Sequence, residues 1–434
     1  MPREKSCSEN PPCPYNVGMS ANQSDVLILG GGVVGLACAN YLLQAGRSVR
    51  IIERGRTGAA TSHGNCGTIT PSHAPPLAAP GMVLKGLKYM LTPDAPLYIQ
   101  PRLDLPLANW LLRFSLRCNH RDWRRTALAK SELLQASRRL LDELVRERQL
   151  DCGYEKSGAH QVYRDAKTFE RDCAELPELA EFGIESRVLS ESELIADEPS
   201  LKPGAIGAIH YPGDAHLRPE RYCAELARLV REGGGEIEED VEINGFVREN
   251  GHVAVATNKG PRAGRDVLMA LGPWSPLLSK QLGLRLPIQP GKGYSISYSR
   301  PTLAPKRPLV LKERSVCVTT WADGFRLGST MEFSGYDASL NRTRLDALER
   351  AALEYLHEPT GPKKIEEWFG WRPMTYDDLP ILGRAPGLEN LWLATGHGML
   401  GVTMSAVTGH LLADLICGRA PIVDPLPSSP QRFA

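Results

Sequence analysis

A chain of 434 residues is long enough for roughly two to three units of ordinary domain size arranged around one ligand. Its 42% hydrophobic and 23% charged residues are typical of a globular protein and exclude the disordered, fibrous and disulfide-scaffold classes. A net charge of +1 without a dense block of Lys and Arg argues against a nucleic-acid partner.

At the N-terminus, residues 1–22 are polar, contain prolines and lack the apolar stretch of a signal peptide. We interpret them as a flexible tail. No run in the chain approaches the ~18 apolar residues that span a bilayer. The sequence therefore predicts a cytoplasmic protein without a membrane span, and a peripheral position at the inner membrane remains open.

A strand, a glycine-rich turn and a helix are predicted next. The apolar run DVLIL over residues 25–29 precedes GGGVVG, and a helical pattern continues over residues 33–45. In the G-x-G-x-x-G pattern, Gly30 permits the turn, Gly32 lets a pyrophosphate approach the backbone, and Gly35 lets helix and strand pack closely. Phosphate charge would then lie at the helix N-terminus, where free N–H groups favour an anion.

A second strand is predicted over residues 48–52, and Glu53 closes it. This carboxylate follows the glycines by about 20 residues, where it can accept hydrogen bonds from ribose hydroxyls. Thr61, Ser62 and Asn65 then offer short polar side chains to a bound dinucleotide, and a polar turn with local backbone caps is the alternative. FAD and NAD both fit this unit.

The far end of the chain repeats the same order of elements. A strand is predicted over residues 391–395, followed by GHGMLG and a helix from about Val402 to Ile416. A second helix N-terminus aimed at the ligand suits the negative charge that a reduced flavin develops near N1 and O2, although a glycine-rich turn without a ligand is the alternative. This favours FAD over NAD.

The chain resembles the FAD-dependent amine oxidoreductases of the D-amino-acid oxidase type over most of residues 24–420. The segments that carry the resemblance are DVLILGGGVVGLACANYLLQAG, ATSHGNCGTITP, DVLMALGPWS, WFGWRPMTYDDLPILG and LWLATGHGMLGVTMSAVTGHLLADLI. The segments HGNCGTITPSHAPPLAAPGMVLKGLKYML and GHGMLGVTMS are most similar to bacterial D-amino-acid dehydrogenases, and GAIHYPGDAHLRPERY is similar to relatives that oxidise hydroxy-D-proline. Glycine oxidase and sarcosine oxidase belong to the same family.

Motifs and resemblance together predict a set of FAD contacts. Some relatives attach FAD covalently through His or Cys, but the patterns around His63 and Cys66 do not match these forms closely. The predicted contacts are Gly30, Gly32, Val33, Val34, Gly35, Glu53, Arg54, Thr61, Ser62, Asn65, Gly67, Val241, Gly272, Gly396, Gly398, Met399, Leu400, Gly401, Val402 and Thr403.

The resemblance also implies substrate-binding residues. Arg372, in WFGWRPM, matches the arginine that grips the substrate carboxylate through a bidentate, charge-assisted pair, and a structural salt bridge is the alternative. Tyr294, in the predicted strand segment GKGYSI, can add a hydroxyl to the carboxylate or line the pocket, and simple packing of a strand tyrosine is the alternative. His397, in GHG, can donate to the flavin pyrimidine or to the substrate.

The expected reaction is oxidation of a small amino acid, of D configuration or of the proline or hydroxyproline type, by hydride transfer from Cα to flavin N5. The resulting imine is open to hydrolysis. Apart from GGGVVG and GHGMLG, which are both assigned to the flavin, the sequence has no G-x-G-x-x-G pattern. We therefore expect electrons to pass to a quinone or a partner protein rather than to a nicotinamide. An oxidase of the glycine or sarcosine type, which would use oxygen, is an alternative.

Two other functions belong to different classes. A disulfide reductase would need a CxxC or CxxxxC pair near the flavin, but the ten cysteines lie scattered, and no Cys/His spacing predicts a metal site. The other is a flavin-containing subunit that passes electrons or binds partner subunits within a larger complex.

The predicted fold class is α/β, with a discontinuous Rossmann-like FAD-binding domain and a substrate domain built on a mostly antiparallel sheet. Between residues 77 and 113 the chain is rich in Pro, Leu and basic residues, and we expect helices there that pack within the domain; a surface that touches a membrane or a partner is the alternative. The FAD-binding segments are predicted as 24–76, 206–275 and 366–420, and the substrate segments as 77–205 and 276–365.

Overall fold

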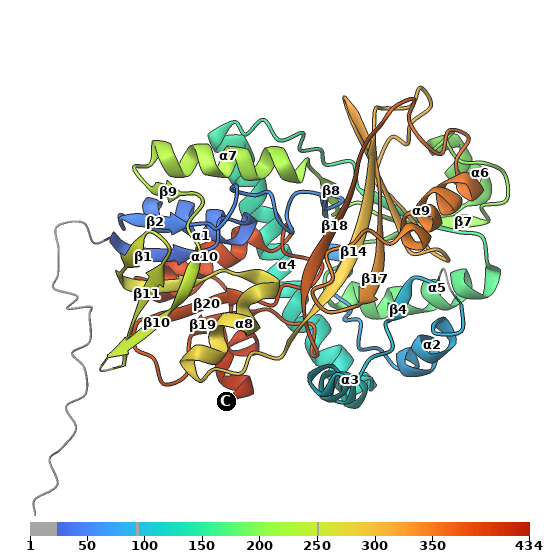
Figure 1. Ribbon diagram of the computed structural model, residues 1–434. Coiled ribbons are helices and arrows are strands. Elements are labelled where there is room, and N and C mark those ends of the chain that lie inside the picture. Colours follow the sequence, from blue (N-terminus) through green and yellow to red (C-terminus); the bar gives the residue numbers. More distant parts are fainter. Residues whose placement is uncertain (1–23, 93–94, 250) are drawn as a thin grey trace, which may run out of the picture.

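The structure, a computed structural model, describes residues 24–92, 95–249 and 251–434 (Figure 1). The tail predicted over residues 1–22 lies outside these ranges. Two large sheets organise the described chain, one on each side of the molecule in the view of Figure 1.

The first sheet has six strands in the order β19-β20-β13-β1-β2-β9. All its pairings are parallel except that of β19 with β20, and β1, the first strand of the chain, lies near the centre. This is the sheet of a dinucleotide-binding fold. Its strands are β1 (Ser24–Leu29), β2 (Val49–Ile52), β9 (Glu236–Glu238), β13 (Gly264–Met269), β19 (Ile381–Arg384) and β20 (Leu391–Thr395).

Strand β1 explains how this sheet is covered, because its side chains alternate between two cores. Val26 and Ile28 are fully buried against helices α1 (Val33–Gln44), α7 (Pro219–Glu232) and α10 (Ser405–Ile416). Leu27 and Leu29 face the opposite side, where a three-stranded antiparallel sheet packs. That small sheet consists of β10 (Ile243–Glu249), β11 (His252–Thr257) and β12 (Gly260–Arg262).

The second large sheet has nine strands in the order β18-β14-β17-β16-β15-β5-β7-β6, with β4 paired to β17. Most pairings are antiparallel, and β15–β5 and β17–β4 are parallel. Its strands are β4 (Leu97–Ile99), β5 (Ala159–Tyr163), β6 (Arg187–Ser190), β7 (Gly207–Tyr211), β14 (Ile288–Tyr298), β15 (Leu309–Leu311), β16 (Val316–Trp321), β17 (Gly324–Phe333) and β18 (Lys364–Thr375).

The remaining elements cover or join these sheets. Helix α9 packs Leu345 and Leu348 against Ile296 and Leu327 of the nine-stranded sheet. The short strands β3 (Thr68–Ile69) and β8 (Ala215–His216) form a separate antiparallel pair. Along the chain, β3 follows β2 of the six-stranded sheet, and β8 follows β7 of the nine-stranded sheet. The helices not yet given are α2 (Met82–Tyr89), α3 (Leu105–Arg117), α4 (His120–Arg148), α5 (Ala166–Glu181), α6 (Glu191–Asp197), α8 (Ser275–Ser279) and α9 (Arg342–Tyr355).

The predicted α/β class with a mostly antiparallel second sheet is confirmed. The division at the boundaries given above stays a prediction. Strands β7 and β18, which that division assigns to the FAD-binding segments, hydrogen-bond within the nine-stranded sheet. The last helix begins at Ser405 rather than near Val402, because residues 401–404 form a turn in which the Thr403 hydroxyl donates to the Thr68 carbonyl.

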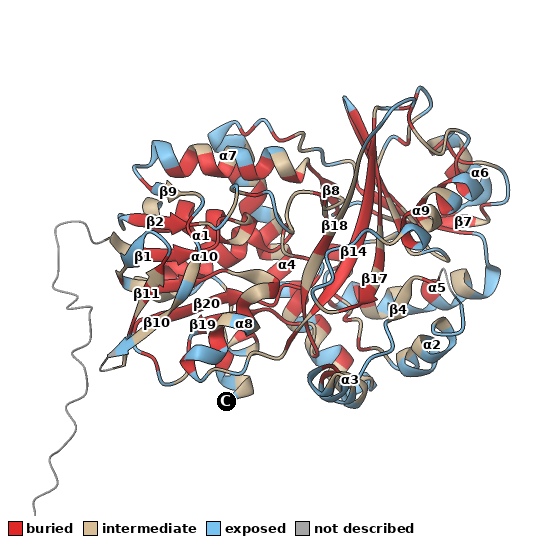
Figure 2. Ribbon diagram, viewed as in Figure 1, coloured by how far each residue is buried: buried red, intermediate tan, exposed pale blue. Residues whose placement is uncertain are grey.

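Helices α2 and α3 differ from the expectation that they pack within the domain. Helix α2 has no buried residue, and α3 buries only Leu107 and Trp110. Figure 2 shows most of β1, β14 and β17 in the colour of buried residues, whereas much of α2 and α3 carries the colour of exposed ones. Part of α3 packs in a small core through Trp110 and Phe114, but many apolar side chains of both helices are exposed, among them Leu84 and Leu116.

Candidate active site

A cavity of about 950 Å³ is lined by residues of both large sheets. One end lies at the turn between β1 and α1, and the nine-stranded sheet supplies a wall through β14, β16, β17 and β18. Trp274, Met374 and Met399 are among the large side chains along it. A continuous space of this kind can hold an extended cofactor and a small substrate together.

The glycine turn offers an open cradle at the dinucleotide end. A Cβ built on Gly32 would meet only the Ser62 hydroxyl, at 3.6 Å, so a side chain there would project into the cavity. A Cβ on Gly35 would lie 2.0 Å from the Gly30 carbonyl oxygen, so Gly35 allows α1 to pack closely on the strand. The arrangement fits the pyrophosphate of FAD at the N-terminus of α1.

The acidic residue after β2 also faces this end. The Glu53 carboxylate accepts from the backbone N–H groups of Gly31, at 2.8 Å, and Gly55, at 3.0 Å, and lines the cavity. These two bonds fix the carboxylate beside the turn. Arg54 lines the same space with its guanidinium 4.2 Å from the ring centre of Trp274, and Val241, also in the lining, is tied to Glu53 by a backbone bond of 2.9 Å.

The polar residues after β2 line the cavity and bind backbone groups. The Ser62 hydroxyl accepts from the Val33 N–H at 3.2 Å, the Thr61 hydroxyl donates to the Trp371 carbonyl at 3.0 Å, and Asn65 accepts from the Gly67 N–H at 2.7 Å. The Asn65 bond is a local cap of the kind weighed as the alternative. The Thr61 and Ser62 bonds instead hold this loop against the first helix and against β18.

The turn before α10 closes another side of the cavity. His397, Gly398, Met399, Leu400, Gly401 and Val402 line it, and the Gly398 N–H donates to the Pro373 carbonyl at 3.1 Å. The ring nitrogen Nε2 of His397 lies 2.9 Å from the Thr408 hydroxyl, and burial lowers the pKa of His397 to about 4. The imidazole is therefore neutral near pH 7 and gives the site no fixed positive charge.

Of the remaining predicted contacts, Gly30, Val33, Val34 and Gly272 line the cavity, whereas Gly35, Gly67, Gly396 and Thr403 lie outside its lining. A Cβ on Gly67 would meet the Leu217 carbonyl oxygen at 1.9 Å, and one on Gly396 would meet Thr375 at 2.9 Å. Backbone packing accounts for these two glycines. Thr403 is buried and bridges the loop at residues 68–70 to the turn before α10.

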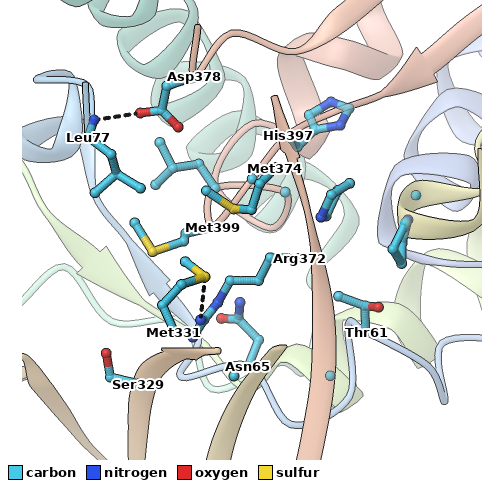
Figure 3. A pocket seen from close by; sticks show the side chains of 18 of the residues that line it. Thr61, Asn65, Leu77, Ser329, Met331, Arg372, Met374, Asp378, His397 and Met399 are labelled. Atoms are coloured by element: carbon cyan, nitrogen blue, oxygen red, sulfur yellow. Dashed lines mark hydrogen bonds between the residues drawn. The ribbon is translucent and has the colours of Figure 1, made fainter. Parts of the chain in front are cut away.

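Arg372 lies on β18 and brings a positive charge to this wall of the cavity. Its guanidinium donates to the Thr330 carbonyl at 2.6 Å and lies 3.7 Å from the Met331 sulfur, and Figure 3 shows this group beside Asn65. Across the described residues it forms no ion pair with a carboxylate. Burial lowers the pKa of Arg372, although an arginine remains protonated. The structural salt bridge weighed as the alternative is therefore absent from this part of the chain.

Two features of the neighbouring strands accommodate the Arg372 guanidinium. A Cβ at Gly293 would lie 2.4 Å from the guanidinium carbon, so only glycine leaves room for it against β14. In β17, Ser329 and Thr330 have φ angles of 144° and 59°, and this irregularity aims the Thr330 carbonyl at the guanidinium. Strained backbone of this kind costs on the order of 1–3 kcal/mol a residue and is concentrated at functional sites.

Tyr294 lines the cavity, but its hydroxyl is engaged elsewhere. Its hydroxyl donates to the Glu332 carboxylate at 3.2 Å, and that carboxylate also accepts from Asn341 at 3.0 Å. The ring is 1% exposed and belongs to the core of the nine-stranded sheet. Since this hydroxyl already has a buried partner, the geometry favours the packing alternative for Tyr294.

Sequence reasoning missed several residues that share the cavity. Lys130 of α4 and Asp378 form a buried ion pair at 2.7 Å, and Asp378 also accepts from the Leu77 N–H at 3.1 Å. No sequence pattern joins residues so far apart. A glycine inside a predicted strand is a recognisable signal of close approach, and Gly293 carries it.

The two residues considered for covalent FAD attachment have different surroundings. His63 lies 3.0 Å from the Glu366 carboxylate. Cys66 lines the cavity, and its sulfur lies so near Gly328 that a Cβ there would approach it to 2.5 Å. Within the described residues, no cluster of His, Cys, Asp and Glu has the geometry of a metal site. The helices of the same ranges include none that is both long enough and apolar enough to span a bilayer.

Curated relatives align with the chain along nearly its whole length. D-amino acid dehydrogenase of Chromohalobacter salexigens is 36% identical over 426 residues, which cover 94% of this chain and 99% of the relative. D-amino acid dehydrogenase of Methylobacterium nodulans is 35% identical over 408 residues, covering 91% and 96%. Among solved structures, glycine oxidase from Geobacillus kaustophilus has the same fold, with a TM-score of 0.76, 22% identity and coverage of 94% and 98%.

One family model matches the part of the chain that forms both large sheets and the cavity. The model of the family described as "DAO: FAD dependent oxidoreductase" matches residues 25–415. These residues include the glycine turn, Arg372 and the turn before α10. The chain therefore belongs to the DAO family of FAD-dependent oxidoreductases.

Proposed function

We propose that the chain oxidises a small D-amino acid at its Cα–N bond, with Arg372 holding the substrate carboxylate. The observation that carries this proposal is a part-buried guanidinium that faces the cavity and pairs with no carboxylate of the described chain. A cation in such a place is stabilised by an anionic ligand, and the planar fork of arginine matches a carboxylate in two hydrogen bonds.

The relatives named D-amino acid dehydrogenase support the choice of substrate class, since they share about a third of their residues with this chain over almost its full length. A substrate of the proline or hydroxyproline type fits the same carboxylate contact. The Met331 sulfur lies 3.7 Å from the guanidinium, and Met374 and Met399 line the same cavity (Figure 3). These side chains give the cavity apolar surface, which suits a small substrate side chain.

The division of labour between cofactor and protein follows from these contacts. Bound FAD supplies the chemistry by accepting a hydride from the substrate Cα. Arg372 fixes the carboxylate, and Gly293 and the Thr330 carbonyl fix the guanidinium in turn. The neutral ring of His397 leaves the substrate ammonium without a repelling cation on that side.

For the return of electrons, we propose a quinone or an electron-carrying partner protein as acceptor, with the chain in a peripheral position at a membrane. The G-x-G-x-x-G pattern occurs twice in the sequence, as GGGVVG at residues 30–35 and as GHGMLG at residues 396–401. Both turns are assigned to FAD, which leaves a nicotinamide without a binding motif of its own. The second candidate is an oxidase of the glycine or sarcosine type that passes electrons to oxygen. The chain shares its fold with a glycine oxidase, but a shared fold alone does not determine which electron acceptor an enzyme uses.

Product formation separates these possibilities. We expect the purified protein to form a 2-oxo acid from a D-amino acid and a water-soluble quinone at least about tenfold faster than from the L-enantiomer, since Arg372 and the flavin fix which face of Cα presents its hydrogen. We expect oxygen alone to support a much lower rate. Hydrogen peroxide produced as fast as quinone is reduced would assign the chain to the oxidase branch.

A further inference from the structure

Helices α2 and α3 expose apolar side chains on a surface that the fold leaves uncovered. We define the α2–α3 face by its large exposed apolar residues. Leu84, Leu91, Leu105 and Leu116 are 68%, 86%, 85% and 67% exposed. The remaining members are Val83, Leu87, Met90, Leu103 and Leu112, all at least 36% exposed.

The charges on these helices have one sign. Helix α2 carries Lys85 and Lys88, helix α3 carries Arg113 and Arg117, and neither helix contains an acidic residue. An amphipathic helix that combines leucines with lysines binds at the boundary between lipid headgroups and acyl chains. Basic residues beside the apolar ones are attracted to anionic headgroups.

The cavity that contains Arg372 reaches this same face. Val83, Leu87 and Met90 of α2 line the cavity and are also exposed, and Leu111 and Phe114 of α3 line it from the other helix. Side chains that line the cavity therefore also form part of the α2–α3 face, and most of them are apolar. A polar amino acid gains little from a route past such side chains, whereas an apolar molecule gains by leaving water.

We infer that the α2–α3 face rests on an anionic bilayer and that a lipid-soluble quinone reaches the cavity past the side chains that the cavity and this face share. This inference rests on the proposed function, which supplies the electrons. Oxidation of the amino acid to its imine releases two electrons and two protons, and reduction of one quinone to one quinol consumes both. An anionic bilayer fits the α2–α3 face better than an acidic protein does. The exposed leucines of this face outnumber the basic residues that could pair with the carboxylates of an acidic protein.

Flotation with lipid vesicles tests the face without any reaction. We expect the FAD-loaded protein to float with vesicles of phosphatidylglycerol and phosphatidylcholine at least about tenfold more than with phosphatidylcholine alone. The double variant Leu84→Glu/Leu91→Glu should lose flotation, and Lys88→Glu should weaken it by about tenfold on the anionic vesicles. The matched control is Leu353→Glu on α9, a leucine 56% exposed on another face, which should float like the wild type.

A quinone assay then tests the route. We expect Leu84→Glu/Leu91→Glu to reduce a long-chain quinone embedded in anionic vesicles at least about tenfold more slowly than the wild type, while its rate with a water-soluble quinone and its flavin content stay unchanged. Neither residue lines the cavity. Failure of the wild type with the soluble quinone would contradict the proposed acceptor and leave the flotation result standing on its own.

Three outcomes would overturn the inference. The wild type could ignore both kinds of vesicle, or the double variant could float as well as the wild type. Alternatively, the protein could form a dimer that Leu84→Glu/Leu91→Glu dissociates, while vesicles bind neither form. That last result would assign the α2–α3 face to a second copy of the chain.

Discussion

Replacing Arg372 with alanine is expected to lower kcat/KM for the best D-amino acid by roughly 30-fold to several-thousand-fold, and Arg372→Lys by less. A desolvated carboxylate left without its partner costs on the order of 2–5 kcal/mol, which converts to that range. Lysine keeps the charge but loses the two-pronged geometry. Flavin content should barely change, since Arg372 binds the Thr330 carbonyl and no segment of the glycine turn.

Two controls separate substrate binding from structural support. An amine without a carboxylate should be oxidised by wild type and Arg372→Ala at similar rates, because the missing contact is absent in both. Arg326, a buried arginine paired with Glu220 and with the Asn65 carbonyl, is the matched residue. Arg326→Ala should lower the melting temperature and the flavin content together. Near-normal kcat/KM in Arg372→Ala would move carboxylate recognition to another residue.

Replacing Gly32 with valine is expected to abolish FAD retention while the protein stays folded. The Cβ of the new side chain would meet only the Ser62 hydroxyl within 4 Å, so the side chain would extend into the space of the cavity, where the pyrophosphate approaches the backbone. The measurement is the ratio of flavin to protein absorbance after purification, together with circular dichroism. Full flavin occupancy would show that the phosphates lie elsewhere.

Neighbouring glycines supply the controls for Gly32→Val. At Gly35 a Cβ would lie 2.0 Å from the Gly30 carbonyl oxygen, so Gly35→Val should disturb the packing of α1 and lower stability as well as FAD binding. At the exposed Gly213 nothing lies within 4 Å of a new Cβ, and Gly213→Val should leave both unchanged. Of these three variants, only Gly32→Val is therefore expected to lose FAD while its stability is retained.

The dinucleotide-binding unit was predictable because its signals are local. The apolar run at residues 25–29, the glycine turn and the position of Glu53 are each contained within one or two elements, and all three have their predicted places in the six-stranded sheet. The strand at residues 391–395 was identified from the same local pattern and is confirmed as β20.

The substrate side was harder to predict because it is assembled across strands. Arg372 was found by resemblance, but its contacts with Gly293 and Thr330 depend on the register of β14, β17 and β18. Tyr294 lies on the same strand as Gly293, and the sequence does not reveal that Glu332 occupies its hydroxyl. The exposure of α2 was not predicted, because a composition rich in Pro, Leu and basic residues does not show what covers a helix.

Anaerobic mixing of the FAD-loaded protein with matched D- and L-amino acids tests the central claim most directly, because it observes the flavin without any acceptor. We expect a small D-amino acid to bleach the visible absorbance of the oxidised flavin, and the L-enantiomer and the corresponding amine without a carboxylate to do so at least about a hundredfold more slowly. A flavin that no amino acid of either configuration bleaches would contradict the assignment and favour a subunit that passes electrons or binds partners.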